Sequence, residues 1–191
     1  MTGKSHIIMN VASGVAIFDT WYLASRLEAS PEWLKFASEK VADYFFEQNM
    51  MPSWVFFSIC IFLYVFGALL PDIDRDTSIL GRVVYVPVGH RTWFHAIYLA
   101  VVFIVCGALW FKPLIWLGLG YLTHLYWDSF SMERTRPLYP SKLRFGISIY
   151  YTGQMSEYIF LSINCFVIIC YTVLVFQLVH HFLPITVDLA P

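Results

Sequence analysis

Charged side chains are scarce in this chain. Lys, Arg, Asp and Glu make up 13% of the 191 residues and give a formal net charge of −1, where soluble proteins average about 25% charged residues. So few and so balanced charges argue against nucleic acid as a partner. Hydrophobic residues reach 59% and gather in long runs, with a mean hydropathy of +0.64. We therefore expect a multi-pass membrane protein.

Several other signals are missing. The cysteines are few, lie in apolar runs and match no zinc motif, so neither a thiolate metal site nor a disulfide framework is expected. No cleavable secretory signal and no internal repeat are evident. The peptidase motif His-Glu-x-x-His is absent, which argues against peptide cleavage. The length fits one helical bundle, a single domain over residues 1–191. The four cysteines are Cys60, Cys106, Cys165 and Cys170.

Five apolar segments predict transmembrane helices. Between the first and the second segment, residues 28–51 carry apolar side chains at three- and four-residue spacing with charges between them, which predicts an amphipathic helix on the membrane surface. The expected fold is all-α, a polytopic membrane helical bundle of about five transmembrane helices plus one amphipathic interfacial helix. Asp19 interrupts the first segment and has no evident role; for this segment, re-entrant insertion is the alternative to a full crossing. The five segments are residues 7–25, 52–70, 93–111, 114–130 and 158–183.

The fourth segment contains the most informative stretch, GYLTHLYWDSF at residues 120–130. His124 and Asp128 are four residues apart, so on a helix they lie one turn apart on one face. An ionisable residue within a span costs about 2.5–3.5 kcal/mol on the insertion scale, so such residues usually face the bundle interior and mark a site. A hydrogen-bonded pair that only ties helices together is the alternative interpretation.

Threading the five segments through a bilayer brings eight candidate metal ligands to one face. His95 is expected one turn into the third span, and Glu157 at the start of the fifth. Histidine and carboxylate donors suit zinc, with manganese or iron as alternatives, and eight donors suffice for two or three ions. Taken alone, Glu157 could be no more than a carboxylate in the first turn of a helix, where the helix dipole stabilises a negative charge. The eight residues are His6, Asp72, Asp74, His90, His95, His124, Asp128 and Glu157.

Arginines accompany these ligands. A guanidinium matches a phosphate group, so Arg91, Arg134 and Arg144 are candidate substrate-binding residues. Their alternative explanation is the excess of positive charge on the cytoplasmic side of membrane proteins, and eight of the twelve Lys and Arg residues fall on this face. The ligand face is accordingly expected to be cytoplasmic.

The chain resembles the bacterial family of LexA-regulated, membrane-bound metal-dependent hydrolases, the YdjM-like proteins. The resemblance rests on six segments in order: GKSHIIMNVA, LLPDIDRDTSILGR, GHRTWFHAI, GYLTHLYWDSF, PLYPSKLRF and GQMSEYI. It implies the same eight polar residues and a location in the bacterial inner membrane. The family is similar, more distantly, to zinc-dependent phospholipases C, whose His-x-x-x-Asp pairs resemble His124 and Asp128, and this implies cleavage of a phosphate ester. The chain departs from the family pattern beside His95 and at Arg75, which bears on the substrate.

The predicted function is a membrane metal-dependent hydrolase that acts on a phosphate ester of a lipid or lipid-linked substrate. Asp74 or Glu157 would accept the proton. One alternative is a non-enzymatic metal-binding protein or carrier, although a carrier needs ligands reachable from both faces. Another is a metal-independent phosphatase of the phosphatidic-acid-phosphatase type. Its Pro-Ser-Gly-His motif resembles residues 87–90, but Val88 replaces the serine.

Overall fold

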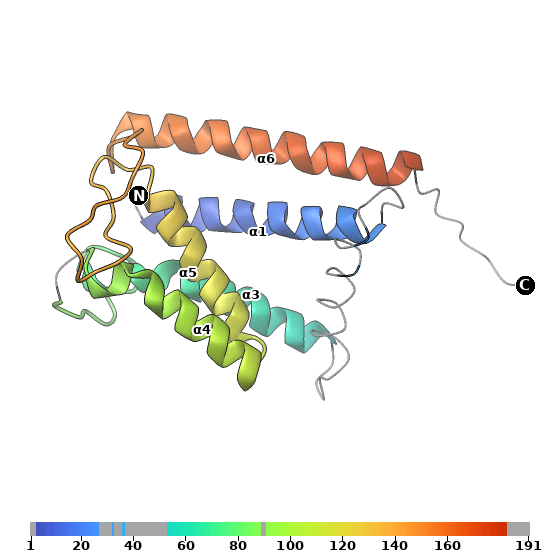
Figure 1. Ribbon diagram of the computed structural model, residues 1–191. Helices are drawn as coiled ribbons and strands as arrows, with labels where there is room; N and C mark the ends of the chain where they lie inside the picture. Colours follow the sequence, from blue (N-terminus) through green and yellow to red (C-terminus); the bar gives the residue numbers. More distant parts are fainter. Residues whose placement is uncertain (1–2, 27–31, 33–35, 37–52, 89–90, 183–191) are drawn as a thin grey trace, which may run out of the picture.

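The molecule is helical throughout the described part of the chain. The computed structural model describes residues 3–26, 32, 36, 53–88 and 91–182, and these contain five α-helices and no β-strand (Figure 1). The all-α expectation is confirmed for this part. The amphipathic helix expected at residues 28–51 lies, apart from positions 32 and 36, outside the described residues. The helices are α1 (Gly3–Arg26), α3 (Ser53–Leu69), α4 (Ile97–Leu109), α5 (Leu114–Asp128) and α6 (Met155–Phe182).

Two of the described helical segments are long and apolar enough to cross a membrane: Val55–Asp74, with 20 residues, and Met155–Val179, with 25 residues. The apolar helix α4 is shorter. Large apolar side chains on α6 are exposed, with Phe166 at 66% and Phe176 at 63%. Apolar side chains that no other part of the protein covers are favourable in contact with lipid, whereas their exposure to water costs free energy. The structure thus supports a membrane protein with at least these two candidate spans.

The five helices share one end of the bundle. Helices α1 and α6 run side by side with their first residues at the same end, and the last residues of α3 and α5 arrive there too (Figure 1). Helix α5 packs against both α3 and α4, while α1 contacts α3, α5 and α6. Side chains at the start of α1 and α4 and at the end of α3 and α5 can therefore meet.

Two short 3-10 helices complete this end. Helix α3 continues into η1 (Leu70–Asp74), where Pro71 is tolerated because a first-turn residue needs no amide hydrogen. The second, η2 (Trp93–His95), is separated from α4 by Ala96, which is extended at φ −89° and ψ 139°. His95 therefore lies in a turn of its own before α4, and the expectation that it sits one turn into a continuous span was wrong. The Tyr121 hydroxyl donates to the Phe94 carbonyl and fixes this turn against α5.

Asp19 has a structural partner. The Thr172 hydroxyl of α6 donates a hydrogen bond of 2.6 Å to Asp19 Oδ2, and on the next residue Thr20 Oγ1 lies 2.8 Å from the Tyr171 hydroxyl. Hydrogen bonds between polar side chains are a common way to join helices in lipid. These two contacts connect α1 to α6 at a distance from the shared end.

The closest helix packing is between α3 and α5, at two glycines. A Cβ atom added to Gly120 would lie 2.0 Å from the Tyr64 carbonyl oxygen, and one added to Gly67 would lie 2.1 Å from the Leu117 carbonyl oxygen. Small residues allow helix backbones in membranes to approach in this way. The approach at Gly120 places His124, one turn further along α5, against the end of α3.

We expect Gly120→Ala to lower the stability of the protein. Alanine normally favours a helix over glycine by about 1 kcal/mol, but here its methyl group would collide with the backbone of α3, and overpacking of this kind costs about 1–3 kcal/mol. Thermal unfolding in detergent measures the effect. In the control variant Gly14→Ala, the added carbon meets a Tyr64 ring atom at 3.1 Å instead of backbone, so its loss should be smaller. An unchanged melting temperature for Gly120→Ala would contradict the packing described here.

Candidate metal centre

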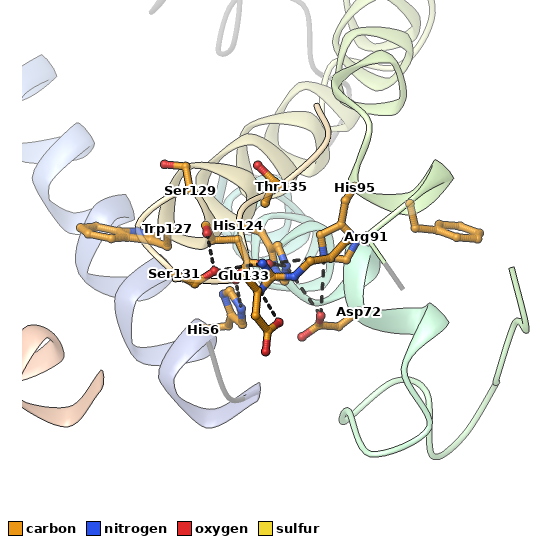
Figure 2. A network of polar contacts seen from close by, with 12 residues as sticks. His6, Asp72, Arg91, His95, His124, Trp127, Ser129, Ser131, Glu133 and Thr135 are labelled. Atoms are coloured by element: carbon orange, nitrogen blue, oxygen red, sulfur yellow. Dashed lines mark hydrogen bonds and ion pairs between the residues drawn. The ribbon is translucent and has the colours of Figure 1, made fainter. Parts of the chain in front are cut away.

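Five buried histidine and aspartate side chains converge at the shared end. His6 comes from α1, Asp72 from η1, His95 from η2, and His124 and Asp128 from α5. The three histidines have no exposed surface, and Asp72 and Asp128 are 4% and 1% exposed. Figure 2 shows His6, Asp72, His95 and His124 pointing to a common centre from different parts of the chain. The pairing of His124 with Asp128 follows the helical spacing, with Nε2 3.7 Å from Oδ2.

Two histidines and two aspartates form a cage. His95 Nε2 lies 3.8 Å from Asp72 Oδ1 and 3.4 Å from Asp128 Oδ2. His124 Nε2 lies 3.8 Å from the same Asp72 oxygen and 3.7 Å from the same Asp128 oxygen. Each imidazole nitrogen thus faces both carboxylates. We call these four residues the cage.

His6 extends the cage on one side. Its Nε2 lies 3.2 Å from the other oxygen of Asp128, Oδ1, and its ring stacks on His124 with centroids 3.8 Å apart. The donor atoms of His6, His124 and Asp128 lie within 4.8 Å of one another, as do those of Asp72, His95 and His124. The two groups share His124, and the two oxygens of Asp128 face different histidines. A carboxylate in that position can bridge two ions.

The protein sets the orientation of two of the imidazole rings. His124 Nδ1 lies 2.6 Å from the Ala68 carbonyl oxygen, which requires a proton on Nδ1 and leaves the lone pair of Nε2 facing the cage. His95 Nδ1 lies 3.5 Å from Asp74 Oδ2, and its Nε2 faces the cage. Metal-binding histidines typically donate their second N–H to a carbonyl or carboxylate in this manner. Asp74 thus supports His95 from behind.

The donor set fits a divalent cation in distance. Ligands that share one tetrahedral zinc ion at about 2.0–2.1 Å are about 3.3–3.4 Å apart, and the four distances between a histidine nitrogen and an aspartate oxygen of the cage are 3.4–3.8 Å. Imidazole nitrogens with carboxylate oxygens are also the donors that zinc, manganese and iron accept.

The donor set fits in charge as well. With the histidines neutral, as metal ligands must be, three buried carboxylates remain close together: Asp72, Asp74 and Asp128. Among the described residues Arg91 is the buried guanidinium next to them, 3.6 Å from Asp128, and a divalent cation is the kind of charge that such a group of carboxylates favours. Buried carboxylates are costly unless a cation of some kind balances them.

The acid–base state of His95 reflects the same field. Burial lowers the pKa of His95, but hydrogen bonds to Asp128 and Asp74 outweigh burial, and the pKa is raised to about 9. The centre thus attracts positive charge strongly enough to hold a proton on a fully buried imidazole. A metal ion binding there has to displace that proton, since only the neutral ring is a ligand.

Arg91 links the centre to the rim of the site. Its guanidinium lies 3.6 Å from Asp128 Oδ2 and 3.2 Å from the carboxylate of Glu133, whose side chain is 56% exposed. It also donates a hydrogen bond of 3.0 Å to the Ser131 hydroxyl and one of 3.3 Å to the Arg134 carbonyl oxygen. Arg91 has a positive φ of 60°, a backbone conformation that costs energy outside glycine.

The structure describes three of the remaining predicted residues: Glu157, Arg134 and Arg144. Glu157 is buried at the start of α6, where Oε2 accepts a hydrogen bond of 2.6 Å from the Gly153 amide, and it belongs to neither group of three. Arg134 and Arg144 are exposed, and Arg134 Nε donates to Ser148 Oγ at 3.1 Å. His90 lies outside the described residues. The metal-binding roles of all eight residues stay predictions.

Sequence reasoning missed the groups that support the centre. Ser131 and Glu133 hold Arg91, yet both are in a loop without periodicity. One turn further along α1, the Asn10 side chain donates a hydrogen bond of 2.7 Å to the His6 carbonyl oxygen and accepts a hydrogen bond from Thr123. Asn10 shares a helix face with His6, which was the available signal for this contact.

A helical, membrane-type bundle with a buried histidine–aspartate cluster at one end is the class of protein that this geometry defines. The chain belongs to the YdjM inner membrane protein family, whose model matches residues 1–182. The uncharacterized protein YvsG of Bacillus subtilis (strain 168) is 32% identical over 107 residues, covering 50% of this chain and 67% of the relative. No solved structure matches the chain. The family supports an inner-membrane location.

We expect His124→Ala to abolish metal binding, because His124 belongs to both groups of three donors. Metal content of purified protein after zinc loading, measured by mass spectrometry, tests this. His180→Ala, which changes a histidine in the last turn of α6, is the matched control and should keep the wild-type content. Equal metal in all three proteins would show that the ion binds elsewhere.

Asp74→Asn should weaken metal binding without preventing it. Loss of a carboxylate behind a histidine ligand typically reduces metal affinity about 10–100-fold, whereas Asp72→Asn replaces a charged donor of the cage itself with a neutral, weaker one and should reduce affinity further. Competition against a fluorescent chelator gives both dissociation constants. If Asp74→Asn were the more damaging of the two, Asp74 would be a ligand and the arrangement above would need revision.

Proposed function

We propose that this protein is a metal-dependent hydrolase of the inner membrane that cleaves a phosphate ester of a lipid or lipid-linked substrate. The observation that carries the proposal is the contact between Arg91 and the cage. A buried guanidinium touches a cage carboxylate on one side and reaches the rim of the site on the other. Cation-binding carboxylates beside an arginine fork are the combination that recognises a phosphoryl group.

Zinc is the ion that suits the donors best, with manganese or iron as alternatives. His6, Asp72, His95, His124 and Asp128 would hold it, and the bridging position of Asp128 would accommodate a second ion. A bound divalent cation supplies two things: it neutralises charge on a phosphoryl group, and it lowers the pKa of water.

The residues of the chain have separate tasks in this proposal. Arg91 donates to a phosphoryl oxygen through the terminal nitrogen that is now paired with Glu133 at the exposed rim, while Ser131 accepts from the other terminal nitrogen and holds the guanidinium in position. Asp74 accepts the N–H of His95 Nδ1 and so orients that ring, and Asp74 is itself the first candidate for the proton acceptor. Glu157 is the second candidate for the proton acceptor, although its hydrogen bond to Gly153 also serves to start α6. Arg134 and Arg144, both exposed, would guide an anionic head group to the rim.

The finer topology belongs to the same proposal. Helices α1, α4 and α5 cross the membrane together with α3 and α6, which makes five crossings. The shared end would face the cytoplasm, since eight of the twelve Lys and Arg residues fall on that side. In support, α4 and α5 are joined by the short connection 110–113 at the end of the bundle opposite the metal centre (Figure 1).

One observation favours a second candidate, a non-enzymatic metal-binding protein. Structural zinc sites are closed by protein ligands, whereas catalytic sites leave a position open, and the five donor residues of this centre are almost completely buried. Activity measurements separate the two functions.

Zinc- or manganese-loaded protein in lipid nanodiscs should release phosphate or a phosphorylated head group from phospholipid substrates, and a chelator should stop it. Arg91→Gln should lower kcat/KM about 10²-fold or more, because a donor to the phosphoryl group is lost. Arg91→Lys should recover only part of this, since lysine keeps the charge but not the fork. Arg82→Gln, a change at an exposed arginine, is the control.

Bound metal without cleavage of any phosphate ester would reject the hydrolase and leave the second candidate. Cleavage that survives chelation would point instead to metal-independent chemistry.

A further inference from the structure

An apolar groove runs between α1 and α6. It has a volume of about 510 Å³, within the range of about 300–1,000 Å³ that is usual for small-molecule sites. Apart from Thr172, its lining is apolar. Residues on its two sides include Ile7, Val11 and Val15 of α1 and Cys165, Ile169 and Val173 of α6.

At the end nearest the start of α1, the groove lies one residue from the metal centre along the chain. Ile7 lines the groove and directly follows His6, whose Nε2 is 3.2 Å from Asp128 Oδ1. Successive residues of a helix point about 100° apart, so His6 faces the centre while Ile7 faces the groove. A molecule with a polar head and an apolar tail could place its head at the centre and its tail between these helices.

Polar side chains mark the opposite end of the groove, further along α1 and α6. Thr172 lines the groove and donates a hydrogen bond of 2.6 Å to Asp19. The neighbouring residues Thr20 and Tyr171 contact each other through their hydroxyl groups. Methylene groups gain nothing by packing on hydroxyl and carboxyl groups that already satisfy one another. We call the contacts of Asp19 and Thr20 with α6 the polar rung.

The distance between the two ends matches one leaflet of a membrane. Ile7 and Asp19 are twelve residues apart on α1, which corresponds to about 18 Å along the helix. The hydrocarbon of one leaflet is about 15 Å thick, half of the roughly 30 Å of a bilayer. A lipid chain that starts at the metal centre would therefore end near the polar rung.

A second groove of about 450 Å³ lies between α1 and α3, has Trp116 of α5 in its lining, and shares Val11 and Val15 with the first. It starts further from His6, because its first α1 residue is Val11 and not Ile7. Its lining residue Tyr64 donates 2.9 Å to the Asn10 carbonyl oxygen, and Asn10 lies between His6 and the first α1 residue of this groove. It offers a control surface of similar size and similar apolar character.

We propose that the groove between α1 and α6 holds an acyl chain of a phospholipid whose phosphate lies at the metal centre. The inference rests on the proposed function for the position of the phosphate, and it adds the substrate class, an acyl phospholipid residing in one leaflet. The polar rung sets the depth to which the chain enters.

Photo-crosslinking tests the inference without any turnover. Full-length protein loaded with zinc is placed in phosphatidylcholine nanodiscs. A phosphonate analogue of phosphatidic acid, which has no phosphate ester to cleave and carries a diazirine at the end of one acyl chain, is then added. Mapping of the labelled residues should place label on Val15, Ile169 and Val173, in excess over the lipid-facing Phe166 and Phe176. The same diacylglycerol without a phosphonate group, and the phosphonate with Arg91→Gln protein, should both give less label in this groove.

Two variants narrow the groove from opposite helices. Ala12→Phe on α1 and Ile169→Trp on α6 should each reduce groove labelling about tenfold, the effect of excluding about two methylene groups. Ile169 is 61% exposed, so its replacement spares the core. Ile61→Trp, in the second groove and 63% exposed, is the matched control and should leave the labelling of the first groove unchanged.

Labelling spread evenly over the lipid-facing side chains would overturn the inference and show ordinary surrounding lipid. Groove labelling that does not depend on the phosphonate group or on Arg91 would also overturn the inference. Crosslinks between the α6 helices of two copies would overturn it as well, because a second copy would then occupy the groove. The proposed hydrolase can fail separately. Phosphonate-dependent labelling of the groove, with no cleavage of phosphate esters by metal-loaded protein, would retain the lipid site and reject the reaction.

Discussion

The structure depends on the carboxylate of Asp128. One oxygen faces His6, and the other faces His95, His124 and Arg91. These contacts join α1, η2, α5 and the turn that carries Arg91. A buried carboxylate is stable only where several donors or cations surround it. The need to satisfy this group therefore fixes the mutual position of segments that are far apart in sequence.

Helix packing makes that arrangement possible. The glycines at positions 67 and 120 let α3 and α5 approach until their backbones touch, which brings His124 within hydrogen-bond distance of the Ala68 carbonyl oxygen. The last turn of α3 then leads into η1, where Asp72 faces the cage and Asp74 lies behind His95. Close backbone contact and buried charge thus support the same geometry.

Part of this could be predicted from sequence, because helical periodicity and chain threading obey simple rules. The i, i+4 spacing placed His124 with Asp128, and counting crossings placed His6, Asp72 and His95 at the same end. The different roles of Asp72 and Asp74 could not be predicted. In a 3-10 helix with 3.0 residues per turn, side chains two residues apart point about 120° apart, so both cannot face one centre. The contacts of Arg91 with Ser131 and Glu133 come from loops, which have no period to read.

The order of synthesis adds a consequence. Helix α1 leaves the ribosome before the helices that carry the partners of its polar side chains. These partners are Asp128 for His6, Thr123 for Asn10 and Thr172 for Asp19. Each of these polar groups is unfavourable in hydrocarbon until its partner arrives. In the proposed topology with five crossings, the newly made α1 is thus a weak membrane segment by itself. It would have to be retained by the insertion machinery, or at the bilayer surface, until α5 and α6 have emerged.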